Sequence, residues 1–106
     1  MPDNRHERIQ EALRVGAAEF LAREANRQSL ITVTRAMLSD DNKRGTIFIT
    51  VLPDDAQEAA VAFANRNRRE FVDFLKTRVK GGIPHQIDFE IDFGEKNRQR
   101  LDELSL

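Results

Sequence analysis

Residues 30–52 have the sequence LITVTRAMLSDDNKRGTIFITVL, which is two strand-like segments joined by a short polar connection. Both segments are rich in β-branched residues, which favour strands. The connection, residues 39–43, is made of residues that form turns. In the second segment the aliphatic residues alternate, so they share one face of the strand; these are Ile47, Ile49 and Val51. The stretch therefore predicts an antiparallel β-hairpin.

Helical patterns lie on both sides of this hairpin. Between Arg5 and Ala25, apolar residues recur at spacings of three and four, as on one face of a helix; they are Ile9, Leu13, Ala17, Phe20 and Leu21. Within this helix, Gly16 either weakens the helix slightly or permits a close approach. After the hairpin, Asp55 and Glu58 have the spacing of a capping box at the start of a second helical region.

The second helical region is interrupted at residues 64–69, ANRNRR, which include no large apolar side chain. A packed helix rarely continues that far without a core anchor, so we predict a kink or turn there and two consecutive helices. The later helix is expected to end at Gly81-Gly82 and to pack on the sheet through Phe71, Phe74, Leu75 and Val79. A third strand is predicted from the alternation of Ile87, Phe89 and Ile91.

The predicted order is α-β-β-α-α-β, an α+β fold with a three-stranded sheet and helices packed on one face. We expect one domain over residues 1–106, with residues from about 93 to 106 as a short helix or a loose tail. This is the element order of the bacterial-type (type II) KH domain. Such modules hold single-stranded nucleic acid where their two consecutive helices meet.

The composition argues against several classes of protein. The chain has no cysteine, which excludes disulfides and thiolate chemistry. It has no apolar run near the roughly 20 residues of a membrane span and no secretory signal, so we expect a cytoplasmic protein without membrane contact. His6 and His85 lack a metal-ligand spacing. The acidic pairs at 40–41 and 54–55 are interpreted as turn and cap residues, so no enzyme activity, small-molecule substrate, metal or cofactor is predicted.

The distribution of charge is the main functional signal. The net charge is -1, yet residues 65–80 include six basic and two acidic side chains. Guanidinium and ammonium groups bind phosphates and release counterions, although a solvated basic helix is the simpler alternative. The candidate RNA-binding residues are Asn65, Arg66, Asn67, Arg68, Arg69, Lys76, Arg78 and Lys80, together with Arg35, Lys43 and Arg44 around the hairpin turn.

Several stretches resemble ribosome-binding factor A: RIQEAL at 8–13, ITVTRAMLSDD at 31–41, IFITVL at 47–52, FEID at 89–92 and RLDEL at 100–104. The resemblance implies a KH-like assembly factor that binds the immature small ribosomal subunit and its rRNA late in maturation, without catalysis.

One feature departs from that family's pattern. The family has an Ala-x-Gly kink between the two helices, where this chain has Asn67 and Arg69, while Asn65 matches the family's asparagine. A general single-stranded RNA-binding module, or a protein-interaction domain that has lost RNA binding, remain the alternatives. In each case we expect a monomer.

Overall fold

The computed structural model describes residues 4–24, 29–79, 82–95 and 98. The elements follow the predicted order: α1 (Arg5–Glu24), β1 (Leu30–Leu38), β2 (Arg44–Leu52), a 3-10 turn η1 (Asp54–Ala56), α2 (Gln57–Arg66), α3 (Arg68–Lys76) and β3 (Gln86–Ile91). Among the described residues, no helix combines the length and the apolar character that crossing a membrane requires.

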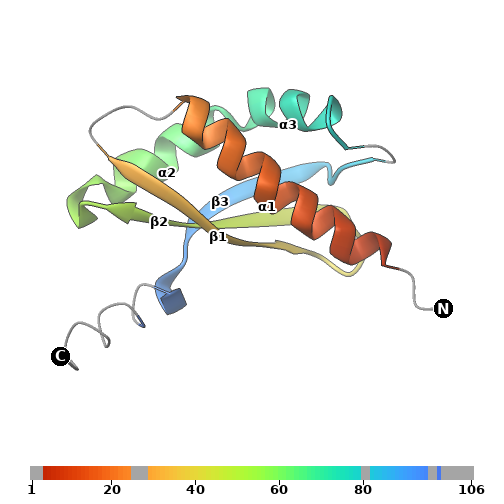
Figure 1. Ribbon diagram of the computed structural model, residues 1–106, viewed down its shortest axis with the longest axis horizontal. Coiled ribbons are helices and arrows are strands. Elements are labelled where there is room, and N and C mark those ends of the chain that lie inside the picture. Colours follow the sequence, from red (N-terminus) through yellow and green to blue (C-terminus); the bar gives the residue numbers. More distant parts are fainter. Residues whose placement is uncertain (1–3, 25–28, 80–81, 96–97, 99–106) are drawn as a thin grey trace.

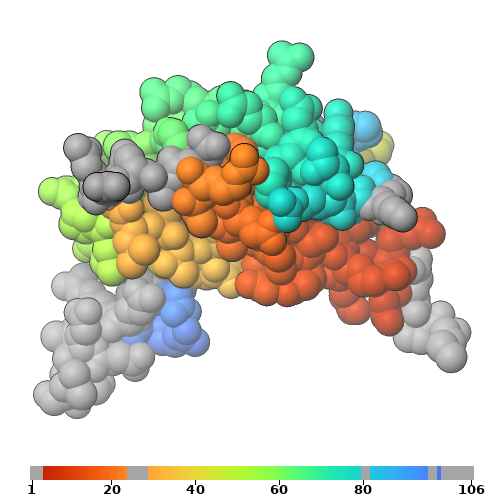
Figure 2. All heavy atoms as spheres, turned by 45° about the horizontal axis from the view of Figure 1, so that its top comes forward, coloured from red at the N-terminus to blue at the C-terminus, as the bar shows by residue number. Residues whose placement is uncertain are grey.

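The sheet has the order β1-β2-β3, and the helices lie on one face of it (Figure 1). Strands β1 and β2 form the predicted antiparallel hairpin. Strand β3 is parallel to β2, with Arg44 opposite Gln86 and Ile49 opposite Ile91. A parallel neighbour needs a crossover connection, which α2 and α3 supply. Figure 2 shows α1 beside the α2–α3 pair on the helical side of the molecule.

The core forms between the helices and the inner face of the sheet. The predicted stripes of α1 and β2 are buried there, except for Ile9, which is partly buried, together with Ile87 and Phe89 of β3. Three phenylalanine rings connect the layers: the centroid of Phe71 lies 5.4 Å from that of Phe20 on α1 and 5.5 Å from that of Phe89 on β3. Tilted rings at these separations attract one another beyond the area they bury.

Gly16 permits a close approach between α1 and α3. A Cβ atom at this position would lie 2.6 Å from Cδ2 of Leu75 and 3.9 Å from Cε1 of Phe71. Both of these side chains are fully buried, so they have little room to move. The close-approach interpretation of this glycine is therefore correct.

Three local expectations from the sequence are wrong. The capping box does not form, because Asp54 and Asp55 lie in η1 and α2 begins at Gln57 without a side-chain cap. Helix α3 ends at Lys76 and does not continue to Val79. The last turn tightens there: the N–H groups of Thr77 and Arg78 donate three residues back, to the carbonyls of Phe74 (3.2 Å) and Leu75 (2.9 Å), and the Thr77 hydroxyl also donates to the Phe74 carbonyl (2.7 Å).

The third difference is at Phe74, which packs against α1 at the margin of the core. Its ring centroid lies 5.8 Å from that of Phe20, and the guanidinium groups of Arg23 and Arg78 lie 5.5 and 4.4 Å from it. The side chain is only half-buried. Phe71 and Leu75 are the core residues of α3.

The two phenylalanines of α3 should therefore differ in their contribution to stability. Phe71→Ala should lower the free energy of unfolding by about 3–5 kcal/mol, the usual cost of removing a fully buried ring. Phe74→Ala should lower it by clearly less, because part of that ring is already in contact with water. Urea unfolding followed by circular dichroism measures both values. Equal losses would contradict this assignment of the core.

The contact at Gly16 gives a second prediction. Gly16→Leu should destabilise the protein by about 1–3 kcal/mol, since overpacking forces neighbouring side chains out of their preferred rotamers. Ala18→Leu places the same side chain on the exposed face of the same helix and should change stability by less than about 0.5 kcal/mol. Helix propensity favours leucine over glycine by nearly 1 kcal/mol, so a loss of stability of Gly16→Leu in thermal unfolding is an effect of packing.

Candidate nucleic-acid interface

A single residue, Asn67, separates α2 from α3. Its backbone has φ -98° and ψ 10°, which needs no glycine. Its side-chain amide donates to the Phe63 carbonyl (2.8 Å), and its own carbonyl accepts from the Phe71 N–H (3.0 Å). The kink is confirmed, and the residue at the family's glycine position, Arg69, lies inside α3 in ordinary helical structure. The missing glycine therefore leaves the junction unstrained.

The other asparagine of the kink, Asn65, holds α2 to the outer edge of β3. Its Nδ2 donates to the Phe89 carbonyl (3.3 Å), and its Oδ1 accepts from the Phe89 N–H (3.1 Å). One amide side chain thus pairs with both backbone groups of an edge-strand residue, as a neighbouring strand would. Asn65 and Asn67 both use their side chains within the fold.

The cations that follow the kink line an open groove between α3 and the start of β3. The groove has a volume of about 500 Å³ and is bordered by Arg68, Arg69 and Lys76, with Asp73 as its one acidic side chain. His85 and Gln86 form the opposite wall, and Val72 and Ile87 also line the groove. We call this the α3–β3 groove. Residues 69 and 76 are two turns apart, so they project from the same side of α3.

The predicted cations differ in whether they are already paired. Arg68 forms an ion pair with Asp88 (2.7 Å), with side chains 52% and 34% exposed, so water screens the pair strongly. Arg78 pairs with Glu19 of α1 and stacks on Phe74. In contrast, Arg66, Arg69 and Lys76 are exposed. The ion pairs found within the described part of the chain involve none of these three.

The hairpin turn reaches the same end of the sheet. The Gln86 N–H donates to the Lys43 carbonyl (3.2 Å), and the Arg44 guanidinium lies 3.5 Å from Oε1 of Gln86. Because Gln86 lines the α3–β3 groove, Lys43 and Arg44 lie beside it. The structure therefore brings together cations from two segments that are more than twenty residues apart. Lys80 lies outside the described residues.

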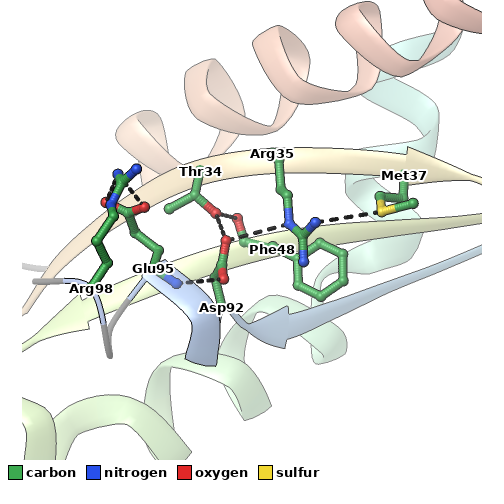
Figure 3. Close-up of polar contacts among 7 residues, drawn as sticks. All are labelled: Thr34, Arg35, Met37, Phe48, Asp92, Glu95 and Arg98. Carbon is green, nitrogen blue, oxygen red and sulfur yellow. Dashed lines mark hydrogen bonds and ion pairs between the residues drawn. The ribbon is translucent and has the colours of Figure 1, made fainter.

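Arg35 lies elsewhere, on the sheet face that carries no helix. Its guanidinium lies 4.3 Å from the ring centroid of Phe48, and its Nε lies 3.4 Å from Oδ2 of Asp92 (Figure 3). A β-bulge between Val33 and Arg35 brings Thr34 to the same carboxylate, with its hydroxyl donating to Oδ2 (2.6 Å). Phe48 thus stacks with an arginine of its own chain.

The carboxylate of Asp92 joins this network to the turn that follows β3. It accepts the Glu95 N–H (2.9 Å), as the residue capping a helix start does. The hydrogen bond from Thr34 lowers the pKa of Asp92; the Glu95 N–H and the Arg35 charge lower it further, against the opposing effect of burial. Asp92 is the one buried charged residue in the described core. Of the predicted tail, residues 93–95 are a helical turn, and the rest, Arg98 excepted, lies outside the described residues.

This network predicts how stability depends on pH. A carboxyl whose pKa is lower in the folded state stabilises the protein at pH values above its unfolded pKa, and this stabilisation is lost as pH falls through the folded pKa. Asp92→Asn should therefore be less stable than the wild type by about 1–3 kcal/mol at pH 7, and the difference should shrink below about pH 4. Urea unfolding between pH 7 and pH 3 measures it. A stability difference between wild type and Asp92→Asn that does not change with pH would contradict the role given to the charge. The control is Glu90→Gln, which removes a carboxylate at an exposed site.

His85, Gln86 and Asp88 are neighbours of the kink cations that were not predicted from the sequence. Their proximity depends on the parallel pairing of β3 with β2, which puts the start of β3 beside the hairpin turn. The order of elements could have predicted this proximity. Two helices between β2 and β3 form a crossover connection, and strands joined by a crossover are expected to be parallel.

Comparison with known proteins supports the fold. The sequence matches no family model and no curated protein. The structure is similar to the crystal structure of ribosome-binding factor A from Thermus thermophilus, with a TM-score of 0.70 and 22% identity over 81% of this chain and 94% of that one.

Two further solved structures are similar. A homology model of the Thermus thermophilus factor, fitted into a cryo-EM map of its 30S complex, gives a TM-score of 0.64 and 22% identity over 81% of this chain and 89% of that one. A solution NMR structure of a Thermotoga maritima protein gives a TM-score of 0.60. It is 19% identical in sequence over 85% of this chain and 90% of that one. The chain therefore has the KH-like α+β fold of the ribosome-binding factor A structures, at no more than 22% sequence identity to them.

Proposed function

We propose that this protein is a non-catalytic assembly factor of the small ribosomal subunit, which it binds through single-stranded rRNA in the α3–β3 groove. The observation that supports this most strongly is that Arg69 and Lys76 line one groove, with Arg44 beside it, in a fold similar to that of ribosome-binding factor A. The fold alone would not be sufficient, because one fold hosts many functions. The proposed site of action is the cytoplasm.

Phosphate binding would depend on side chains in this chain. The junction at Asn67 has no glycine loop whose backbone N–H groups could surround a phosphate. Arg69 and Lys76 provide two exposed charges about 10 Å apart along α3, since they are separated by seven residues of 1.5 Å rise. Arg68 can join them by exchanging its screened ion pair with Asp88 for a phosphate, because surface pairs of this kind are worth at most about 1 kcal/mol.

The edge of β3 offers groups that could contact bases. The N–H groups of Gln86 and Asp92 point toward β2, and strand residues alternate, so the backbone groups of Ile87, Phe89 and Ile91 point toward the outer edge. Asn65 occupies those of Phe89. The backbone N–H and C=O groups of Ile87 lie at the wall of the α3–β3 groove. There they can pair with an unstacked base, as RNA-binding modules do with single strands.

The proposal is tested by removing two groove charges. Arg69→Ala with Lys76→Ala should weaken binding to single-stranded RNA oligonucleotides that together cover the small-subunit rRNA sequence. The plot of log K against log salt should become flatter by about 1.4 units, because each neutralised phosphate contributes about 0.7 on single strands. Sedimentation of the tagged wild type with free small subunits, and loss of this co-migration in the variant, tests the ribosomal part.

The matched control is Arg8→Ala with Arg14→Ala, which removes the same charge from α1. Its binding and its salt dependence should stay close to those of the wild type. Equal weakening by both double variants would refute the groove as the RNA site. RNA binding without co-sedimentation would leave a general RNA-binding module, and co-sedimentation without RNA binding would indicate a protein contact.

A further inference from the structure

The sheet face opposite the helices has a second surface with a different chemistry. None of the helices α1 to α3 lies on this face, which within the described residues is crossed only by the turn after β3, where Asp92 reaches Thr34 of β1 (Figure 1). Leu30 and Leu52 lie opposite each other at one end of the β1–β2 pair, 62% and 59% exposed. Thr32 and Thr50 form the next pair. Phe93, just beyond β3, is 64% exposed. Three large apolar side chains are thus exposed toward the same end of the sheet, and exposed apolar surface is typical of interaction sites.

A groove of about 520 Å³ lies near this end of the sheet, at the end of β3. Its apolar lining includes Phe48, Val61, Ile91 and Phe93, and Glu90 is its exposed acidic residue. We call it the β3-end groove. The network of Arg35 and Asp92 forms part of the wall and holds it in place (Figure 3).

The charge around the β3-end groove is negative. The turn after β2 and the start of α2, both near this end, contribute the exposed carboxylates of Asp55 and Glu58, and Glu90 adds a third. No ion pair involving these three is found within the described residues. The nearby cations Arg35 and Arg98 are both paired, with Asp92 and Glu95. Such a surface repels phosphate and attracts cations.

The protein itself shows what an aromatic ring beside a carboxylate binds. Arg35 is held by the Phe48 ring and the Asp92 carboxylate together. Phe93 and Glu90 line the neighbouring groove with the same two chemical groups, and both are exposed. A guanidinium or ammonium group over an aromatic ring gains about 0.5–1 kcal/mol at an exposed site, and a carboxylate strengthens the contact.

We propose that the β3-end groove binds a basic segment of a partner protein. An arginine or lysine of that segment enters between Phe93 and Glu90, and its apolar residues cover Leu30 and Leu52. The negative charge and the apolar lining favour a basic polypeptide over RNA. Because this surface lies at the far end of β3 from the α3–β3 groove, the domain could hold RNA and a basic protein at the same time.

The test uses a fluorescent peptide of alternating arginine and leucine as the probe, with a peptide of alternating glutamate and leucine as the charge control. The arginine peptide should bind the protein and shift the amide NMR signals of Phe48, Glu90 and Phe93. Phe93→Ala should weaken its binding about fivefold, and Glu90→Lys at least as much. Glu7→Lys makes the same charge reversal on exposed α1 and should leave binding close to that of the wild type.

Three outcomes would overturn the proposal: no binding of the arginine peptide, equal binding of the glutamate peptide, or shifts confined to the α3–β3 groove. A single-stranded RNA that shifts the Phe93 and Glu90 signals would assign the surface to RNA instead. Because the two variants leave the α3–β3 groove intact, their effect is independent of whether the proposed RNA site is correct.

Discussion

The close contact between α1 and α3 is the constraint on which the rest of this structure depends. Gly16 allows Leu75 to pack directly against α1, and Phe71 fills the space between Phe20 and Phe89. These contacts fix the rotation of α3 about its own axis. Once Phe71 and Leu75 face the core, the helical period directs Arg69 and Lys76 away from it. The core therefore positions the basic side of the α3–β3 groove.

At the junction between α2 and α3, a side chain stabilises the kink, so the backbone needs no glycine conformation there. Asn67 has an ordinary negative φ, and its amide satisfies a carbonyl of the preceding turn. Asn65 then fixes the direction of α2 relative to β3 by pairing with both backbone groups of Phe89. Two short amide side chains thus position the helix pair, and the nearby cations remain free of that structural role.

The sequence was sufficient to predict the order of elements, the hairpin, the kink and most of the core, because each depends on local periodicity. It was insufficient to predict the contacts of side chains that have more than one possible partner in the fold. Phe74 has the spacing of a sheet-facing residue, yet it lies at the α1 side of α3, where Arg23 and Arg78 cover its ring. Arg35 looks like a surface cation, yet a bulge brings it and Thr34 to Asp92, 57 positions along the chain from Arg35. Such long-range pairs leave no pattern in a single sequence.

The net charge of -1 is compatible with RNA binding because the charges are not evenly placed. Parallel pairing of β2 and β3 gives the sheet two distinct ends. The start of β3 lies beside Arg44 and the cations of α3, and its end carries the exposed carboxylate of Glu90. Counterion release depends on the phosphates that a local cluster neutralises, and charges farther away than about 8–10 Å are largely screened at physiological salt. An RNA bound at the basic end would therefore lose little affinity to the carboxylates at the acidic end.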